Sequence, residues 1–279
     1  MGTRNFFELL RRRWEEGYFA CVGLDSDYRK IPESARRDSI ENTITGFNRA
    51  IVEATKDIVC AYKPNIAFYA KYGRKGLDAL RCTIENIHAF APDVPVILDA
   101  KRGDIGNTNE GYVEEAFNDL KADAITVHPY LGAEALQPFL SQPEKGIFIL
   151  CRTSNKGASE FQNLLVDGEP LYCRVARNVA SDWNKNGNCG LVVGATYPDE
   201  LGKVRRIVGD MPILIPGIGA QGGDVKKTVS AGKDSRGQGM IINSSRGIIF
   251  ASDSLDFAEA ARSATLKLHE AIEEVLTAQ

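Results

Sequence analysis

The strongest constraint on the fold is a rhythm in which short apolar runs alternate with helix-like segments along the whole chain. Each run has the length of a strand, and its apolar residues are nearly continuous rather than alternating with polar ones. Such strands are covered on both faces, which is typical of a parallel sheet. The runs lie at 18–25, 58–65, 94–101, 124–129, 146–153, 190–196, 211–219 and 239–247.

A helix-like pattern follows every run, and one more precedes the first. The patterns lie at 3–16, 33–56, 67–90, 108–120, 132–140, 170–185, 198–208, 222–231 and 254–277. Alternation of this kind predicts an α/β fold, and eight repeats favour a closed TIM (β/α)8 barrel with an extra N-terminal helix. No G-x-G-x-x-G follows the first run, which weakens the dinucleotide-binding alternative. Because no linker-like stretch interrupts the 279 residues, we expect a single barrel domain over 1–279.

Composition narrows the class of function. The net charge is −3, whereas a nucleic-acid or anionic-membrane surface would need a basic excess. No apolar stretch approaches the length of about 18 residues expected of a membrane span, and the first residues lack the apolar region of a signal peptide. Six cysteines, several inside apolar runs, indicate reduced, buried thiols. We therefore expect a cytoplasmic protein that binds neither nucleic acid nor membrane.

The barrel hypothesis says where to look for a site. In such barrels the active site lies at the carboxyl ends of the strands, so polar residues that end the runs should meet in space. These residues are Asp25 and Asp27; Lys63 and Asn65; Asp99, Lys101 and Asp104; His128; Arg152, Thr153 and Ser154; Thr196; Gly217, Gly219 and Gln221; and Ser244, Ser245 and Arg246.

The last two strand ends carry a phosphate-binding pattern. "PGIGAQGGD" (216–224) is a glycine-rich turn that opens a helix, and "NSSRGI" (243–248) places Arg246 beside a glycine. Glycines allow backbone N–H groups to approach an anion, and a guanidinium binds two phosphate oxygens at once. The alternative is a pair of tight turns. Because the loops after strands 7 and 8 commonly bind phosphate in this architecture, we expect a phosphorylated small molecule.

The third strand ends in an unusual cluster of charges, "VILDAKRGDIGNT" (96–108). In an extended strand Asp99 and Lys101 point to the same side, and Lys63 on the adjacent strand reaches the same space. Such a network keeps the carboxylate ionised and the lysines charged, and a protonated lysine held there is a proton donor. The alternative is an ion-pair network that only closes the barrel mouth. No zinc-ligand spacing or serine nucleophile elbow accompanies it, so we expect no metal and no cofactor.

At these residues the sequence resembles the orotidine 5′-phosphate decarboxylase family. "LDAKRGDIGNT" contains that family's Asp-x-Lys-x-x-Asp signature, which sugar-phosphate decarboxylases of the same suprafamily share. "GLDSD", "YKPN", "CRTSN", "PGIGAQGGD" and "NSSRG" follow in the family's order, and the length resembles its longer bacterial subgroup. The resemblance implies a metal- and cofactor-independent enzyme that decarboxylates orotidine 5′-monophosphate to UMP in de novo pyrimidine biosynthesis, as a homodimer with shared active sites.

The resemblance also implies roles for individual residues. Lys101 would protonate C6 of the pyrimidine, Asp99 would face the departing carboxylate, and Lys63 would complete the catalytic network. The other implied contacts are Asp25 and Asn65 to the sugar or base; Asp104, Ile105 and Thr108 across into the partner subunit's site; Thr153 and Ser154 to the pyrimidine; and Pro216, Gln221, Arg246 and Gly247 around the substrate and its phosphate.

Two other functions stay open at this point. One is a Mg²⁺-dependent decarboxylase of a keto-sugar phosphate from the same suprafamily, and the other is a non-catalytic barrel that binds a nucleotide. The polar segment 155–169 follows the fifth strand, and its length and composition suit either a lid over the site or a disordered insertion.

Overall fold

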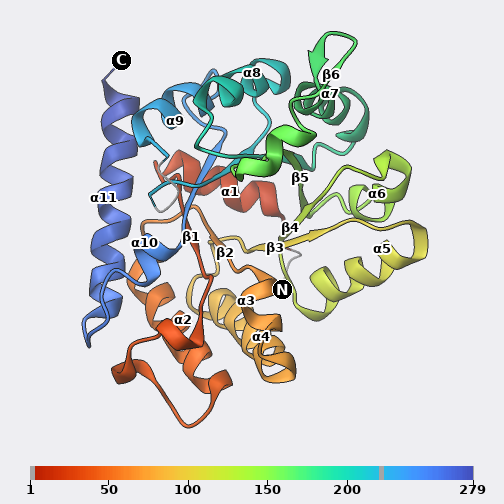
Figure 1. Ribbon diagram of the computed structural model, residues 1–279. Helices are drawn as coiled ribbons and strands as arrows, with labels where there is room; N and C mark the ends of the chain where they lie inside the picture. The colour runs from red at the N-terminus through yellow and green to blue at the C-terminus, as the bar shows by residue number, and fades with distance from the viewer. Residues whose placement is uncertain (1–3, 220–222, 279) are drawn as a thin grey trace.

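The structure is a computed structural model that describes residues 4–219 and 223–278 (Figure 1). Within that range the chain forms one closed sheet of eight parallel strands, with neighbours in the order β2-β1-β10-β9-β8-β5-β4-β3. Backbone bridges from Tyr62 to Val96 and from Asn65 to Asp99 join β2 to β3 and close the barrel. The strands are β1 (Ala20–Gly23), β2 (Ala61–Lys63), β3 (Ile97–Arg102), β4 (Ala124–Val127), β5 (Gly146–Arg152), β8 (Cys189–Val193), β9 (Ile213–Pro216) and β10 (Met240–Ser244).

Helices surround this barrel, so the predicted (β/α)8 architecture with an extra N-terminal helix is confirmed (Figure 1). Among the described residues, no helix combines the length and the apolar character needed to cross a membrane. The helices are α1 (Phe6–Glu15), α2 (Ile40–Thr55), α3 (Ile66–Ala70), α4 (Gly73–Phe90), α5 (Gly106–Val113), α6 (Gly132–Leu140), α7 (Leu171–Asn178), α8 (Pro198–Val208), α9 (Val225–Gly232), α10 (Arg246–Ile249) and α11 (Phe257–Thr277).

The expected helices differ from the observed ones where backbone geometry breaks the 3.6-residue period. The helix expected over 67–90 is divided into α3 and α4, because Gly73, the first residue of α4, adopts φ +62. The helices expected over 108–120 and 170–185 each end in a π-helical turn, at Glu114–Asp119 and Val179–Trp183.

Regular structure was not expected in two further regions. The segment 155–169 contains a 3₁₀ turn (Lys156–Glu160), and a small antiparallel pair, β6 (Leu165–Val166) and β7 (Glu169–Pro170), forms at its end. The reading of 155–169 as a disordered insertion is therefore wrong. The second region is α10, which follows β10 directly and is only one turn long.

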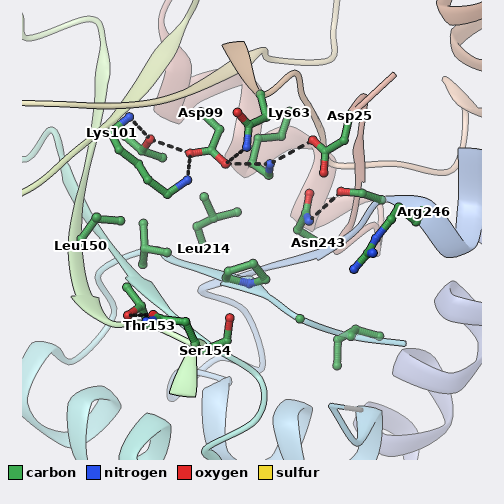
Figure 2. Close-up of a pocket in the computed structure, with 18 of the residues that line it drawn as sticks. Asp25, Lys63, Asp99, Lys101, Leu150, Thr153, Ser154, Leu214, Asn243 and Arg246 are labelled. Atoms are coloured by element: carbon green, nitrogen blue, oxygen red, sulfur yellow. Dashed lines mark hydrogen bonds and ion pairs between the residues drawn. The ribbon is translucent and has the colours of Figure 1, made fainter. Parts of the chain in front are cut away.

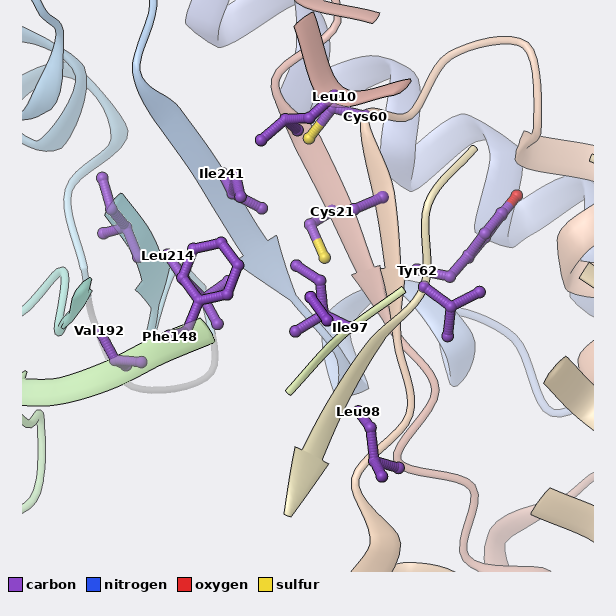
Figure 3. Packing of buried hydrophobic residues seen from close by; sticks show 14 of the residues in the cluster. Leu10, Cys21, Cys60, Tyr62, Ile97, Leu98, Phe148, Val192, Leu214 and Ile241 are labelled. Carbon is purple, nitrogen blue, oxygen red and sulfur yellow. The ribbon is translucent and has the colours of Figure 1, made fainter. Parts of the chain in front are cut away.

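The barrel interior is packed with apolar side chains from facing strands, among them Cys21, Ile97, Phe148 and Ile241 (Figure 3). Each such side chain contributes about 1.5–3 kcal/mol when it is fully buried. Below them the barrel is closed by α1, whose Phe6 ring packs edge-on against Phe148 at 5.5 Å. Because α1 covers the end where the strands begin, the end where they finish is left for a ligand.

A buried carboxylate fastens the chain ahead of α1 to the barrel. Asp123, at the start of β4, accepts hydrogen bonds from Arg4 at 2.8 and 3.0 Å and from the Val96 amide at 2.9 Å. Burial alone would raise the pKa of Asp123. The adjacent His88 ring and the Arg4 guanidinium outweigh it, so the pKa falls from 3.8 to about 2. Asp123 therefore stabilises the fold in its ionised form.

This pKa shift predicts how stability depends on pH. Because the folded-state pKa of Asp123 lies below the unfolded value, its contribution is complete above about pH 4 and is lost as the pH falls towards 2. Asp123→Asn should lower the free energy of unfolding by about 2 kcal/mol at pH 7, and the difference from wild type should shrink between pH 4 and 2. Denaturant titrations at pH 7, 4 and 2.5 measure it. Asp119→Asn, which removes an exposed partner of Arg81, is the control and should change little. An equal loss at all three pH values would contradict the assignment.

Candidate active site

Four charged side chains from β1, β2 and β3 form a continuous array at the open end of the barrel (Figure 2). The Lys63 side chain is buried, with its Nζ 3.1 Å from Asp99 Oδ2 and 3.9 Å from Asp25 Oδ1. The other oxygen of Asp99 lies 2.6 Å from Lys101 Nζ. Asn65 also donates to Asp99, at 3.3 Å. The predicted juxtaposition of these residues is therefore present in the structure.

The array fixes the charges of its central members. Burial would raise the pKa of Asp99, but the cations Lys63 and Lys101 outweigh it and hold this pKa well below its usual value. Burial would likewise lower the pKa of Lys63, but Asp99 and Asp25 outweigh it and raise this pKa above its usual value. Asp99 is therefore an anion and Lys63 a cation throughout the ordinary pH range.

The geometry of Lys101 depends on an irregularity of β3. Its backbone adopts φ +48, a left-handed conformation that costs a non-glycine residue about 1–3 kcal/mol, and the register against β4 shifts at this point. Thr126 of β4 supports the irregularity: its hydroxyl accepts from the amides of Ala100 and Lys101 at 3.1 and 3.0 Å and donates to Asp99 at 2.9 Å. Asp99 and Lys101 do meet, as predicted. The expected cause was wrong, because the irregular backbone at Lys101, and not regular strand alternation, brings the two side chains together.

The array forms one wall of a cavity of about 490 Å³. Figure 2 shows Thr153 and Ser154 on another side, and Arg246 at the far end from Lys101. The predicted residues that line the cavity are Asp25, Lys63, Asn65, Asp99, Lys101, Thr153, Ser154, Pro216, Gly217, Ser245 and Arg246. The predicted residues that do not line it include Asp27, His128, Arg152, Thr196, Gly219, Ser244 and Gly247, and Gln221 lies outside the described residues.

The end of the cavity near Arg246 has the features expected of a phosphate site. Arg246 is exposed and begins α10. The backbone at Gly217 adopts φ +108 and at Gly219 φ +77, conformations that favour glycine. The Gly223 amide donates to the carbonyl of Gly217 at 3.2 Å, and Gly217 lines the cavity. This end can therefore bind an anion while the charged array faces the rest of the same molecule.

The second half of the charged motif lies outside the cavity of its own chain. Asp104 Oδ1 accepts a hydrogen bond from the amide of the next residue, Ile105, at 2.7 Å. Ile105 is 59% exposed and Thr108 is exposed on α5. None of the three lines the cavity. The structure thus separates Asp99 and Lys101 from the residues that follow them.

Several residues of the site were not expected from the sequence. Gln162 lines the cavity and holds Thr153, whose amide donates to Gln162 Oε1 at 2.9 Å and whose hydroxyl accepts from Gln162 Nε2 at 2.9 Å. Thr126 and Asn243 also line it. Both could have been found from the sequence, because each is a polar residue inside an apolar run. The loop around Gln162 carries no comparable pattern.

In this (β/α)8 barrel, a lysine–carboxylate array and an arginine beside glycine-rich turns lie at the same end. This combination is typical of enzymes that act on phosphorylated small molecules. The sequence profile of the Orotidine 5′-phosphate decarboxylase / HUMPS family matches residues 20–261. The chain is 53% identical over 269 residues to the orotidine 5′-phosphate decarboxylase of Azoarcus sp. strain BH72, covering 96% of this chain and 98% of that one. The chain therefore belongs to this family, as its motifs predicted.

Solved structures agree. The Leishmania donovani OMP decarboxylase superposes with a TM-score of 0.85 at 38% identity, covering 99% of this chain and 100% of that one. The Leishmania donovani UMP synthase superposes with a TM-score of 0.88 at 40% identity, and this chain spans 57% of its length. In the described residues, no group of three or more His, Cys, Asp or Glu side chains is placed to hold a metal ion.

A tight contact between β1 and β10 offers a test of the phosphate corner. A Cβ at Gly23 would lie 1.8 Å from Ser245 Oγ and 2.8 Å from Ser245 Cβ, so Ser245, the residue before Arg246, must shift. We expect this shift to misplace the Arg246 guanidinium, so Gly23→Ala should weaken binding of UMP about tenfold or more, measured by calorimetry. Gly202→Ala on α8, where a Cβ meets only ordinary contacts, is the control. Unchanged affinity in folded Gly23→Ala would contradict the placement of the phosphate.

Proposed function

We propose that this chain decarboxylates orotidine 5′-monophosphate to UMP, with Lys101 as the proton donor to C6. The observation that carries the proposal is the array Lys63–Asp99–Lys101, which stands in one cavity with an anion-binding end at Arg246. Family membership supports the reaction, and the geometry supports the assignment of roles.

The chemistry requires a cation at the reacting carbon. When the bond from C6 to its carboxylate breaks, the electron pair stays on C6 as a vinylic carbanion, and the ring offers no electron sink. Lys101 Nζ, held by Asp99 at 2.6 Å, stabilises this charge electrostatically and donates its proton to C6 as CO₂ leaves. The Lys101 side chain is half exposed, so it regains a proton from solvent.

The remaining contacts hold the substrate so that its C6 lies next to Lys101. Arg246, Gly247 and Gln221 bind the phosphate, and Pro216 packs beside the substrate. Thr153 and Ser154 hydrogen-bond the pyrimidine, and Asp25 and Asn65 bind the sugar with Lys63. Because the phosphate takes no part in the bond changes, its binding energy serves to position C6 and to keep the loops closed.

The proposal includes a homodimer in the cytoplasm, built from one barrel domain per chain over 1–279. Asp104, Ile105 and Thr108 do not line the cavity of their own chain, which leaves them available to a partner subunit's cavity. Two large apolar residues after β4, Tyr130 and Leu131, are 86% and 45% exposed and offer apolar surface for such a contact. All six cysteines lie in the described residues as free thiols, which suits a reducing compartment.

The proton-donor role predicts a large loss of turnover without a matching loss of binding. Lys101→Ala should lower kcat for orotidine 5′-monophosphate about 10²–10⁴-fold, the usual size of a general-acid contribution. Release of CO₂ from carboxyl-labelled substrate measures kcat, and calorimetry with UMP measures binding. Lys203→Ala, which removes an exposed lysine on α8, is the matched control. Normal turnover by Lys101→Ala would show that another group protonates C6.

The shared site predicts complementation between two inactive variants. In Lys101→Ala the chain's own contribution is lost, and in Asp104→Ala the contribution to the partner is lost. After subunit exchange in an equal mixture, about one quarter of all sites should regain both residues, because a two-fold dimer forms two equivalent sites. The CO₂ assay should therefore recover about a quarter of wild-type activity. A mixture no more active than its components would argue against shared sites.

A further inference from the structure

A fully buried polar network lies behind the array, away from the cavity. The Asn48 amide on α2 donates to Tyr69 Oη at 2.9 Å and to Thr83 Oγ1 at 3.0 Å, and its oxygen accepts from Ser26 Oγ at 2.5 Å. Tyr69 Oη in turn donates to the Leu24 carbonyl at 2.9 Å. Asn48, Ser26 and Tyr69 are 0% exposed. The network therefore ties α2, α3 and α4 to the segment that follows β1.

The two points of attachment, Leu24 and Ser26, are the immediate neighbours of Asp25 in the chain. The next residue, Asp27, is fixed separately, with its Oδ1 2.9 Å from Lys71 Nζ and accepting from Tyr72 Oη at 2.8 Å. Leu24, Ser26 and Asp27 are thus bound to α2, to α3 or to the turn between α3 and α4. Of the four residues 24–27, only Asp25 lines the cavity.

Asp25 itself is held but not saturated. Its buried Oδ1 lies 3.9 Å from Lys63 Nζ and accepts no hydrogen bond from the described residues. The Asp25 side chain is nevertheless 17% exposed and lines the cavity, so its carboxylate is open to a ligand that brings hydroxyl donors. The ribose of the proposed substrate supplies such hydroxyls.

We infer that Asn48 and Tyr69 are positioning residues, which aim the Asp25 carboxylate at the ribose hydroxyls of the substrate. The inference rests on the proposed function for the identity of the ligand. Neither residue lines the cavity. Tyr69 holds the Leu24 carbonyl on one side of Asp25, and Asn48 holds the Ser26 hydroxyl on the other. A hydrogen-bonded network with every member satisfied is rigid, and small errors in the placement of a binding group weaken its hydrogen bond steeply.

The experiment separates sugar recognition from fold stability. Calorimetry measures the affinities of UMP, 2′-deoxy-UMP and 3′-deoxy-UMP for wild type, Tyr69→Phe, Ser26→Ala and Asp25→Ala. Tyr69→Phe keeps the ring and removes only the hydroxyl that joins Asn48 to Leu24. Thr265→Val is the matched control, because it removes a buried hydroxyl on α11 that donates to the Ala261 carbonyl, remote from Asp25 in the chain.

Wild type should prefer UMP to at least one deoxy analogue by about tenfold or more, because hydrogen bonds to a charged group are strong. Tyr69→Phe and Ser26→Ala should lose at least about fivefold of this preference, and Thr265→Val should keep it. In an Asp25→Ala background Tyr69→Phe should cause no further loss, which is the signature of residues that act through one another.

Other results would overturn the inference. They are equal loss of affinity for UMP and both analogues, an additive effect in Asp25→Ala, or no preference for UMP in wild type. Thermal unfolding of each variant identifies a variant that fails to fold, and the milder Ser26→Ala then carries the test. Absence of CO₂ release by wild type would refute the proposed function alone, because nucleotide binding is measured without turnover.

Discussion

The ion pairing of buried Lys63 with Asp99 and Asp25 is the interaction on which the rest of the site depends. A lysine ammonium placed in a protein interior loses its proton unless carboxylates compensate for the loss of water. Here the two carboxylates raise the pKa of Lys63, and Lys63 with Lys101 lowers that of Asp99. Each charge is therefore maintained by the others. A substrate that enters the cavity meets fixed charges that need no reorganisation during the reaction.

The barrel makes this arrangement possible by dividing its two ends between stability and chemistry. At one end α1 and the Arg4–Asp123 contact close the interior. At the other end β3 departs from regular geometry at Lys101, and the hydroxyl of Thr126 on the neighbouring strand supports the departure. The backbone at Lys101 is thus strained, and the surrounding regular strands hold it in this conformation. Such strain is common at functional sites.

The sequence predicted the barrel, its family and most residues of the cavity, because each rests on local pattern. The helices over 132–140 and 198–208 were predicted at their observed limits, since Gly132 and Pro198 mark their starts. Features that arise from contacts between distant segments were not predictable. The backbone of Lys101 depends on Thr126 in another strand, and α10 is too short to show a period. The hydrogen bond from the Thr153 amide to Gln162 likewise forms only when the loop that contains Gln162 folds back onto β5.

We propose that amino-acid side chains alone, through this charged array, decarboxylate the substrate. This can be measured as the rate of CO₂ release from orotidine 5′-monophosphate by protein dialysed against EDTA, compared with the same protein before dialysis and after addition of Mg²⁺. If no metal takes part, turnover is the same in all three samples. Turnover that disappears with EDTA and returns with Mg²⁺ would contradict this proposal and would favour a metal-dependent reaction at this site.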